Sequence, residues 1–294
     1  MKVSVIVPAY NEAENIPFLV EEFDRFSKEH KDYEVIVVDD GSNDGTFDIA
    51  NNYKRPYLKV IQHKRNLGKT QAIISGATHA QGSIIVVFDA DLQYDPQDIP
   101  KLIELIDQGA DITTGWKQGK YEKKFVSNIY NCWARQLFKL EIHDMNAIKA
   151  FKKEVLKVIP LRKDWHRYIV PLAKDAGFKI AEAKVNLRPR KYGQPKYQQK
   201  FRILIGFFDL LAVKFQLTFM QKPLLYFGTI GLGSVACGII AGIISIILRL
   251  FGHGFRPLLY LVILLIISGI LFFSLALICE SIRAILDRLE KREP

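Results

Sequence analysis

The stretch Ser83-Ile-Ile-Val-Val-Phe-Asp-Ala-Asp-Leu-Gln93 joins an apolar run to two carboxylates. Residues 83–88 have the length and composition of a buried strand, and Asp89 and Asp91 follow where such a strand opens into a loop. This spacing favours a hard divalent cation, which takes oxygen ligands and leaves positions for substrate phosphates. An isolated pair of this kind is more often two solvated turn residues, so the neighbouring segments decide between the interpretations.

Short β-rich runs alternate with helical patterns over the first 115 residues. In the first helical pattern, apolar side chains recur at spacings of three and four and share one face: Ile16, Leu19, Val20, Phe23 and Phe26. The β-rich runs cover residues 3–7, 34–38, 58–61, 83–88 and 111–114. This repetition predicts an α/β fold with a mostly parallel, Rossmann-like sheet that helices cover on both sides.

Three polar clusters follow predicted strands at their carboxyl ends. They are Pro8-Ala-Tyr-Asn-Glu12, Asp39-Asp-Gly-Ser-Asn-Asp-Gly45 and Asp89-Ala-Asp91. Taken separately, the first is also typical of a helix start and the second of a turn with an N-cap. Ligands of open α/β sheets bind at this edge, so the three together favour a nucleotide pocket. We expect Asp39 to accept hydrogen bonds from a base, with Pro8 and Tyr10 packed on the base or ribose.

Two uncharged apolar segments lie in the last third of the chain. Residues 224–248 and 257–279 are each long enough to cross about 30 Å of hydrocarbon as a helix. They predict a transmembrane hairpin, with two buried helices of a soluble protein as the alternative. Lys and Arg are more numerous outside the hairpin than in its turn, so we expect the N-terminal part and the tail in the cytoplasm, at the cell membrane. Gly238 and Gly242 form a G-x-x-x-G pattern that favours close helix packing.

The formal net charge of +10 is clustered. From Lys184 to Lys222, nine residues are Lys or Arg and one, Asp209, is acidic. Beside a predicted membrane entry, such a stretch favours contact with anionic headgroups or an anionic substrate. Nucleic acid is the rival partner of a basic patch, and the hairpin disfavours it. Residues 201–219 are apolar with interspersed charges, which suits helices in the membrane interface.

The motifs in combination resemble one enzyme family. The segments Val7-Pro-Ala-Tyr-Asn-Glu12, Val37-Val-Asp-Asp-Gly-Ser-x-Asp-Gly-Thr46, Asn66-Leu-Gly-Lys69 and Asp89-Ala-Asp-Leu-Gln93 are similar to those of the GT-A glycosyltransferases of family 2. Within that family the chain looks like the polyprenyl-phosphate glycosyltransferases of the dolichyl-phosphate mannose synthase type. The likeness covers nearly the whole chain, including the basic residues 188–193 and the Lys222-Pro-Leu-Leu225 entry to the hairpin.

This resemblance implies a GT-A nucleotide-binding domain, a nucleotide sugar donor and a Mg²⁺ or Mn²⁺ ion. The residues that it assigns to the metal are Asp91 and Gln93, with Asp89 beside them. The residues that it assigns to the nucleotide are Pro8, Ala9, Tyr10, Glu12, Val38, Asp39, Asp89, Ala90 and Asp91.

The resemblance also implies a polyprenyl phosphate acceptor, dolichyl or undecaprenyl. A phosphate monoester is already an oxyanion at neutral pH, since its second pKa is about 6, so it needs cationic positioning rather than a strong base. We expect direct displacement with inversion, in which Asp91 supports the metal and the leaving group. The side chains expected to hold the acceptor phosphate or to close over the diphosphate are Lys117, Lys123, Ser127 and Arg202, with Lys196 and Lys200 as further candidates. His166, a lone histidine beside a tryptophan, is a secondary candidate for catalysis, because such a histidine is more often structural and the acceptor needs no base.

The predicted organisation is a catalytic domain over residues 1–200, juxtamembrane amphipathic helices over 201–222, two transmembrane helices over 223–281 and a basic tail over 282–294. The predicted function is transfer of one sugar from a GDP-mannose or UDP-glucose type of donor to the polyprenyl phosphate. A processive polysaccharide synthase is one alternative, although the sequence has no Gln-x-x-Arg-Trp motif and only two apolar segments. A non-catalytic membrane scaffold is the other. The sugar, the base and the oligomeric state, which includes a homo-oligomer, stay open.

Overall fold

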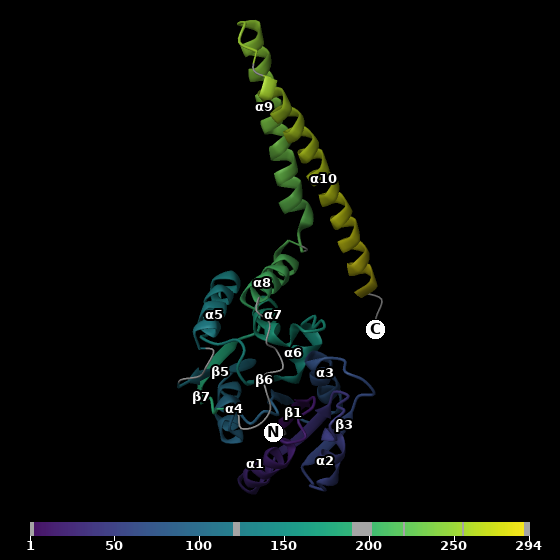
Figure 1. Cartoon of the computed structure of the whole chain (residues 1–294), viewed down its shortest axis with the longest axis vertical. Helices are drawn as coiled ribbons and strands as arrows, with labels where there is room; N and C mark the ends of the chain where they lie inside the picture. The colour runs from purple at the N-terminus through teal and green to yellow at the C-terminus, as the bar shows by residue number, and fades with distance from the viewer. Residues whose placement is uncertain (1–2, 120–123, 190–201, 220, 255, 291–294) are drawn as a thin grey trace. The chain divides into compact units, whose positions relative to one another are not determined.

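The computed structural model describes residues 3–119, 124–189, 202–219, 221–254 and 256–290. The chain divides into two compact units, Met1–Phe208 and Asp209–Pro294. The first unit is an α/β domain, and the second is dominated by two long helices (Figure 1).

Parallel strands joined by helices form the first half of the sheet. The strands are β1 (Val3–Ala9), β2 (Tyr33–Asp39), β3 (Leu58–Gln62) and β4 (Ile84–Val87), and all their pairings with one another are parallel. The helices between them are α1 (Ile16–Glu29), α2 (Thr46–Asn52) and α3 (Lys69–His79). The mostly parallel α/β arrangement that the sequence predicts is therefore confirmed.

Helices cover both faces of this half-sheet. The five apolar side chains of α1 predicted to share a face are all buried, in one core cluster with Val5 and Val86 of the strands. The other face is covered by α3, which approaches β1 closely at Gly76. A Cβ at Gly76 would lie 2.5 Å from Ile6 Cγ2 and 3.2 Å from Val38 Cγ2, so a larger residue there would displace the helix.

Three more strands complete a seven-stranded sheet of order β3-β2-β1-β4-β6-β5-β7. They are β5 (Ile112–Gln118), β6 (Lys149–Lys152) and β7 (Ile180–Asn186). β6 runs antiparallel between β4 and β5, and Lys149 is level with Val87 on one side and Thr114 on the other. The sequence predicted β5 but neither β6 nor β7. The helices of this half are η1 (Pro96–Asp98), α4 (Ile99–Asp107), α5 (Lys124–Phe138), α6 (Lys153–Val158), η2 (Trp165–Tyr168) and α7 (Ile169–Asp175).

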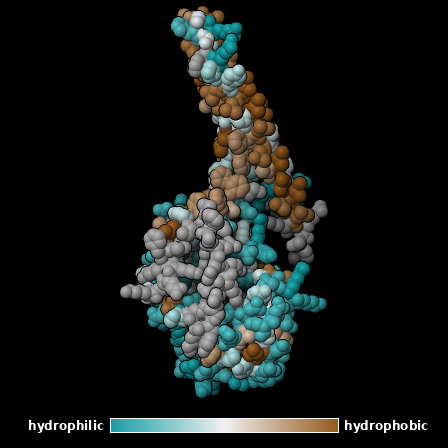
Figure 2. Space-filling model, viewed as in Figure 1, coloured by the Kyte–Doolittle hydropathy of each residue, from teal (hydrophilic) through white to brown (hydrophobic). Residues whose placement is uncertain are grey.

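The C-terminal part of the chain contains the apolar helices. The helix α8 (Arg202–Thr218) crosses the division between the units and is followed by η3 (Leu224–Gly228), α9 (Thr229–Leu250) and α10 (Arg256–Glu290). Two stretches, Leu224–Leu250 and Arg256–Leu286, have the length and composition of membrane spans, with mean hydropathies of 2.4 and 3.0. Their surface is largely hydrophobic, as Figure 2 shows. Contiguous exposed apolar surface of this extent is typical of membrane or protein contact.

Three glycines bring α9 and α10 together. A Cβ at Gly231 would lie 2.7 Å from Gly269 O, and a Cβ at Gly269 would lie 2.7 Å from Gly231 O. Gly238 is also tight, at 2.8 Å from Ile266 Cγ1, whereas a Cβ at Gly242 would meet Val262 Cγ1 at an ordinary 3.6 Å. The predicted G-x-x-x-G contact is therefore half right: Gly238 packs closely and Gly242 does not, and the backbones come closest at Gly231 and Gly269.

Candidate active site

The carboxyl ends of β1, β2 and β4 meet at one edge of the sheet, because β1 lies between the other two and all three are parallel. The polar clusters after β1 and β2 also hold each other in place. The backbone N–H of Asn11 donates to Ser42 Oγ at 2.8 Å, and that of Glu12 donates to Thr46 Oγ1 at 2.9 Å. The predicted proximity of these clusters is therefore present in the structure.

Asp39 is fully buried at the end of β2, and its two carboxylate oxygens differ in their hydrogen bonds. Its Oδ1 accepts hydrogen bonds from the backbone N–H of Ser42, at 3.3 Å, and from the Ser42 hydroxyl. Its Oδ2 has no hydrogen-bond partner among the described residues. Since buried polar atoms in folded proteins are almost always hydrogen-bonded, this oxygen suits a donor on a bound ligand, such as the N–H of a base. Pro8 and Tyr10 are half-buried at the neighbouring strand end.

The neighbouring Asp40 is a structural residue. It is 3 % exposed and accepts three hydrogen bonds, from His63 Nδ1 at 2.8 Å, Leu67 N at 2.9 Å and Gly68 N at 2.8 Å. His63 in turn contacts Ser75 Oγ through Nε2, at 2.9 Å. This network fixes the loop that leads into α3. The sequence placed Asp40 in a polar cluster but did not show that it serves this loop.

Lys69, the first residue of α3, forms an ion pair with Asp89 Oδ1. Burial by itself would raise the pKa of Asp89, but the positive charge and hydrogen bond of Lys69 outweigh it, helped by Lys149, and the pKa is lowered. Asp89 is therefore ionised at neutral pH. Lys69 belongs to the Asn66-Leu-Gly-Lys69 motif, to which the sequence assigned no individual role, and the structure brings it to the carboxylate edge.

Asp91 and Gln93 lie in a turn that two hydrogen bonds stabilise. Asp91 is 8 % exposed, and its Oδ1 accepts the backbone N–H of Gln93 at 3.3 Å. Gln93 Nε2 donates to Arg188 O at 3.4 Å. Between the two, Leu92 has φ of +59°, in the left-handed region that a branched residue rarely adopts.

These groups fit a Mg²⁺ or Mn²⁺ ion by their chemistry. The Asp91 carboxylate, the Gln93 amide oxygen and the Asp89 carboxylate are hard oxygen donors within five residues, in a turn held by hydrogen bonds. Over the described ranges no three His, Cys, Asp or Glu side chains gather as a metal cluster. Magnesium sites for nucleotides rarely need one, because one or two carboxylates together with substrate phosphates suffice.

Lys117 is part of a largely buried ion pair. Its Nζ lies 3.2 Å from Asp144 Oδ2, and the two side chains are 12 % and 4 % exposed. Asp144 is itself fixed, since its carbonyl accepts from Thr114 Oγ1 at 3.0 Å and its Oδ1 accepts from Asn146 N at 2.9 Å. Lys117 was expected to hold the acceptor phosphate. An ammonium group has three donors, so its contact with Asp144 is compatible with binding a phosphate oxygen.

Lys149 is a buried cation that the sequence did not single out. It is 7 % exposed in β6, and its Nζ donates to Ala147 O at 2.9 Å. Burial, with repulsion from Lys69, lowers the pKa of Lys149 to about 7, although Asp89 and Asp144 favour the charged form. Its charge at neutral pH is therefore sensitive to anions bound nearby. No sequence pattern marks it, because β6 is four residues long and was not predicted.

His166 is buried and bonded to α3. Its Nδ1 lies 3.2 Å from Thr70 Oγ1, and that oxygen also accepts the backbone N–H of His166. Burial, followed by the charges of Lys69 and Arg167, lowers the pKa of His166 to about 2. The imidazole is neutral at physiological pH, which agrees with its structural interpretation.

The remaining predicted residues are only partly described. Ser127 lies in α5 and accepts a hydrogen bond from Asn131 Nδ2 at 3.4 Å. Arg202 begins α8, but its side chain lies outside the described residues, as do Lys123, Lys196 and Lys200. The roles of these residues stay predictions.

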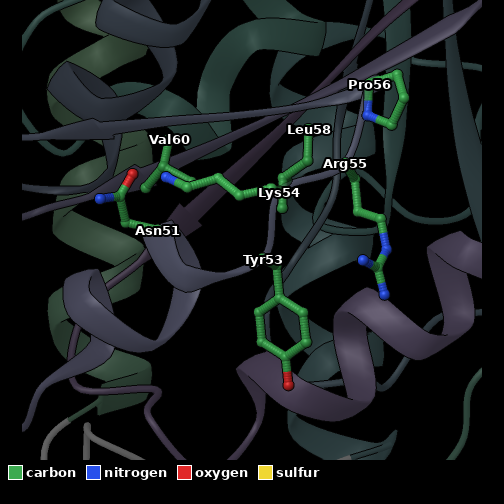
Figure 3. A pocket seen from close by; sticks show the side chains of 7 residues that line it. All are labelled: Asn51, Tyr53, Lys54, Arg55, Pro56, Leu58 and Val60. Atoms are coloured by element: carbon green, nitrogen blue, oxygen red, sulfur yellow. The ribbon is translucent and has the colours of Figure 1, made fainter.

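A shallow pocket of about 370 Å³ lies elsewhere, between the end of α2 and β3 (Figure 3). Because residues 53–56 precede β3, the pocket is at the amino ends of the strands, away from the carboxylate edge. The guanidinium of Arg55 in its wall is engaged by Asp24, at 2.8 Å and 3.0 Å. None of the predicted site residues lines this pocket.

Solved structures with a similar fold include two synthases of sugar phosphoglycerates. Glucosyl-3-phosphoglycerate synthase from Mycobacterium tuberculosis, crystallised with Mn²⁺, UDP and glucosyl-3-phosphoglycerate, has a TM-score of 0.58 at 19 % identity, over 74 % of this chain and 79 % of that one. Mannosyl-3-phosphoglycerate synthase from Rubrobacter xylanophilus has a TM-score of 0.58 at 16 % identity, over 73 % and 74 %. These similarities identify the fold as that of GT-A enzymes.

The sequence relatives have higher sequence identity, and two of the three cover more of the chain than these structures do. Dodecaprenyl-phosphate galacturonate synthase of Rhizobium johnstonii is 30 % identical over 96 % of this chain and 88 % of its own. Undecaprenyl-phosphate 4-deoxy-4-formamido-L-arabinose transferase of Pseudomonas syringae is 26 % identical over 95 % and 84 %. Dolichol-phosphate mannosyltransferase of Pyrococcus furiosus is 35 % identical over 68 % and 60 %. The model of the family "Glycosyl transferase family 2" matches residues 4–158, from β1 to the end of α6. The chain belongs to glycosyl transferase family 2.

Proposed function

We propose that this protein transfers one sugar from a nucleotide diphosphate sugar to a polyprenyl phosphate at a membrane. The observation that carries the donor half is the convergence of Asp39, Asp89 and Asp91 at one edge of the sheet, where Asp39 has a buried oxygen that no described residue hydrogen-bonds. The acceptor half is supported by relatives named for dodecaprenyl, undecaprenyl and dolichol phosphates, two of which align with about 95 % of the chain. That alignment includes the apolar helices.

The proposed roles follow from chemistry at this edge. Asp39 accepts a base N–H, and the side chains after β1 line the base and ribose. A Mg²⁺ or Mn²⁺ ion bound by Asp91 and Gln93 would neutralise charge on the departing diphosphate. Lys117 supplies a cation for the acceptor phosphate, whose oxygen needs no strong base because it is already ionised. We infer a single inverting displacement, with α9 and α10 in the cell membrane and the catalytic unit on its cytoplasmic side.

A transfer assay tests this proposal. The full-length protein in detergent is incubated with labelled UDP- or GDP-sugars, undecaprenyl or dolichyl phosphate, and Mn²⁺ or Mg²⁺. We expect a lipid-linked monosaccharide that fails to form with EDTA. A long polymer would identify a processive synthase, and absence of any product with every donor and acceptor pair would contradict the proposal.

Asp91→Asn provides the matched test of the metal turn. The substitution keeps the size of the side chain and an oxygen acceptor for Gln93 N, so the fold should survive. Loss of a metal carboxylate should reduce transfer by more than about 100-fold. Asp107→Asn, at the exposed end of α4, is the control and should transfer as the wild type does. Wild-type turnover by Asp91→Asn would remove Asp91 from the mechanism.

A further inference from the structure

Arg188 joins the turn that carries Asp91 and Gln93 to the end of β7. The backbone N–H of Arg188 donates to Gln93 O at 2.8 Å, and its carbonyl accepts Gln93 Nε2 at 3.4 Å. The main chain of Gln93 and its side-chain amide are thus both held by one residue that is 95 positions away. These contacts set the direction of the Gln93 amide, because its nitrogen is committed to Arg188.

The guanidinium of Arg188 secures the same turn from the other side. Its Nη2 pairs with Asp95, two residues beyond Gln93, and its Nη1 lies 2.7 Å from Glu22 Oε1 on α1. Asp95 also caps η1, through a 3.0 Å bond from Gln97 N to its Oδ1. Arg188 therefore connects the end of β7 with α1 and with the turn 91–95 through four contacts.

The turn contains a strained backbone position at Leu92. Leu92 holds φ of +59° while its side chain is 4 % exposed in the core. A branched residue in the left-handed region is strained and persists only where its surroundings determine the conformation. The bonds from Arg188 act on Gln93 and Asp95, one and three residues after this strained position.

We propose that Arg188 is a positioning residue that holds the Asp91–Gln93 turn in the conformation needed to bind the metal and the donor diphosphate. This inference rests on the proposed function for what the turn binds, but the restraint itself is a property of the free protein. Arg188 touches neither substrate nor metal in this role. It acts through Gln93 and Asp95.

The test compares Arg188→Met with Arg55→Met. Arg55 is a close match, since it makes a two-pronged ion pair with Asp24 and its side chain is 40 % exposed, against 39 % for Arg188. It lies at the opposite edge of the sheet. Amide hydrogen exchange of the peptide covering residues 89–95 is measured on full-length protein without metal or nucleotide, together with the Mn²⁺ concentration for half-maximal transfer.

We expect Arg188→Met to exchange faster than wild type in residues 89–95 and to need about 10-fold more Mn²⁺, the usual effect of losing a group that orients a metal ligand. Arg55→Met should match the wild type in both measurements. Equal exchange in residues 89–95 for the two variants overturns the inference. If wild-type protein shows no transfer, the proposed function fails, and the exchange comparison still decides whether Arg188 restrains the turn.

Glu22→Gln keeps the test decisive if Arg188→Met does not fold. Burial of the Glu22 carboxyl outweighs the attraction of Arg188 and raises its pKa, so a neutral amide of the same shape is tolerated there. The variant weakens one prong of the Arg188 contact. Faster exchange in residues 89–95, smaller than for Arg188→Met, supports the inference, and unchanged exchange contradicts it.

Discussion

Replacement of Asp40 by alanine should destabilise the catalytic unit strongly. Asp40 is 3 % exposed, and its carboxylate accepts hydrogen bonds from His63, Leu67 N and Gly68 N. Alanine would leave all three donors buried without an acceptor. Breaking a buried charged network by removing one partner costs about 3–5 kcal/mol. With about 2–4 °C of Tm per kcal/mol for a unit of this size, the melting temperature should fall by about 6–20 °C.

Asp24→Ala is the matched control for this prediction. The Asp24 carboxylate also accepts several hydrogen bonds, from Nε and Nη2 of Arg55 and from Tyr57 OH, but its side chain is 32 % exposed. Exposed pairs contribute about 1 kcal/mol or less, because water replaces the lost partner. The Tm of this variant should therefore fall by less than about 4 °C.

The assay is thermal unfolding of full-length protein in detergent, followed by near-ultraviolet circular dichroism, which reports on the aromatic residues of the core. Asp40→Asn separates the effect of charge from that of shape. Its amide oxygen can still accept a hydrogen bond, while its NH₂ group faces one of the donors. The Tm of Asp40→Asn should therefore lie between the values for Asp40→Ala and wild type. A Tm for Asp40→Ala within 3 °C of that for Asp24→Ala, a margin of about 1 kcal/mol, would contradict the structural role of Asp40.

The remaining predictions concern Lys149 and the helical hairpin. Burial lowers the pKa of Lys149 to about 7 in the folded protein, against 10.5 for the ordinary side chain of the unfolded chain. Between these two pH values the unfolded chain binds one more proton than the folded protein, so the free energy of unfolding of the wild type should rise with pH through that window. The Tm advantage of Lys149→Met over wild type should then be largest at or below pH 7 and shrink toward pH 10; a difference independent of pH would contradict the lowered pKa. In the hairpin, the Cβ of Gly269→Leu would lie 2.7 Å from Gly231 O. This overpacking should destabilise the protein by about 1–3 kcal/mol and so lower its melting temperature in detergent. Gly242→Leu, with an ordinary 3.6 Å neighbour, should not, and equal losses in the two variants would show that the close approach at Gly269 is unimportant.

The predictable part of the fold is the part built from continuous apolar runs. β1, β2 and β4 are buried on both faces by helices, so their sequences are almost entirely apolar and stand out. β6 and β7 do not. β6 is four residues long and begins and ends with lysine, and in β7 only Val185 is buried. Such strands are defined by their partners across the sheet, and a single sequence does not show those partners.

The candidate site divides in the same way. Asp39, Asp89 and Asp91 were predicted because they directly follow recognisable strands, and position along a parallel strand translates into position at a sheet edge. Asp144 could not be found by this route. It lies in an irregular segment 27 residues beyond Lys117, and its importance comes from a contact, 3.2 Å long, that depends on the placement of β5.

Residues that looked interchangeable in the sequence therefore have separate tasks in the structure. The turn interpretation and the binding interpretation of Asp39-Asp-Gly-Ser-Asn-Asp-Gly45 competed for the same motif. In the structure the Asp44 carboxylate accepts hydrogen bonds from Ala13 N and Thr46 N, both at 3.0 Å, and the Asp40 carboxylate accepts from the loop before α3. Both carboxylates therefore stabilise the local backbone. Asp39 is different, because its Oδ2 is buried and has no hydrogen-bond partner in the part of the chain that the structure describes. A carboxylate that is costly to bury and incompletely satisfied is retained where a ligand supplies the missing donor, so among these three acids it is Asp39 whose replacement by alanine should affect nucleotide binding more than folding.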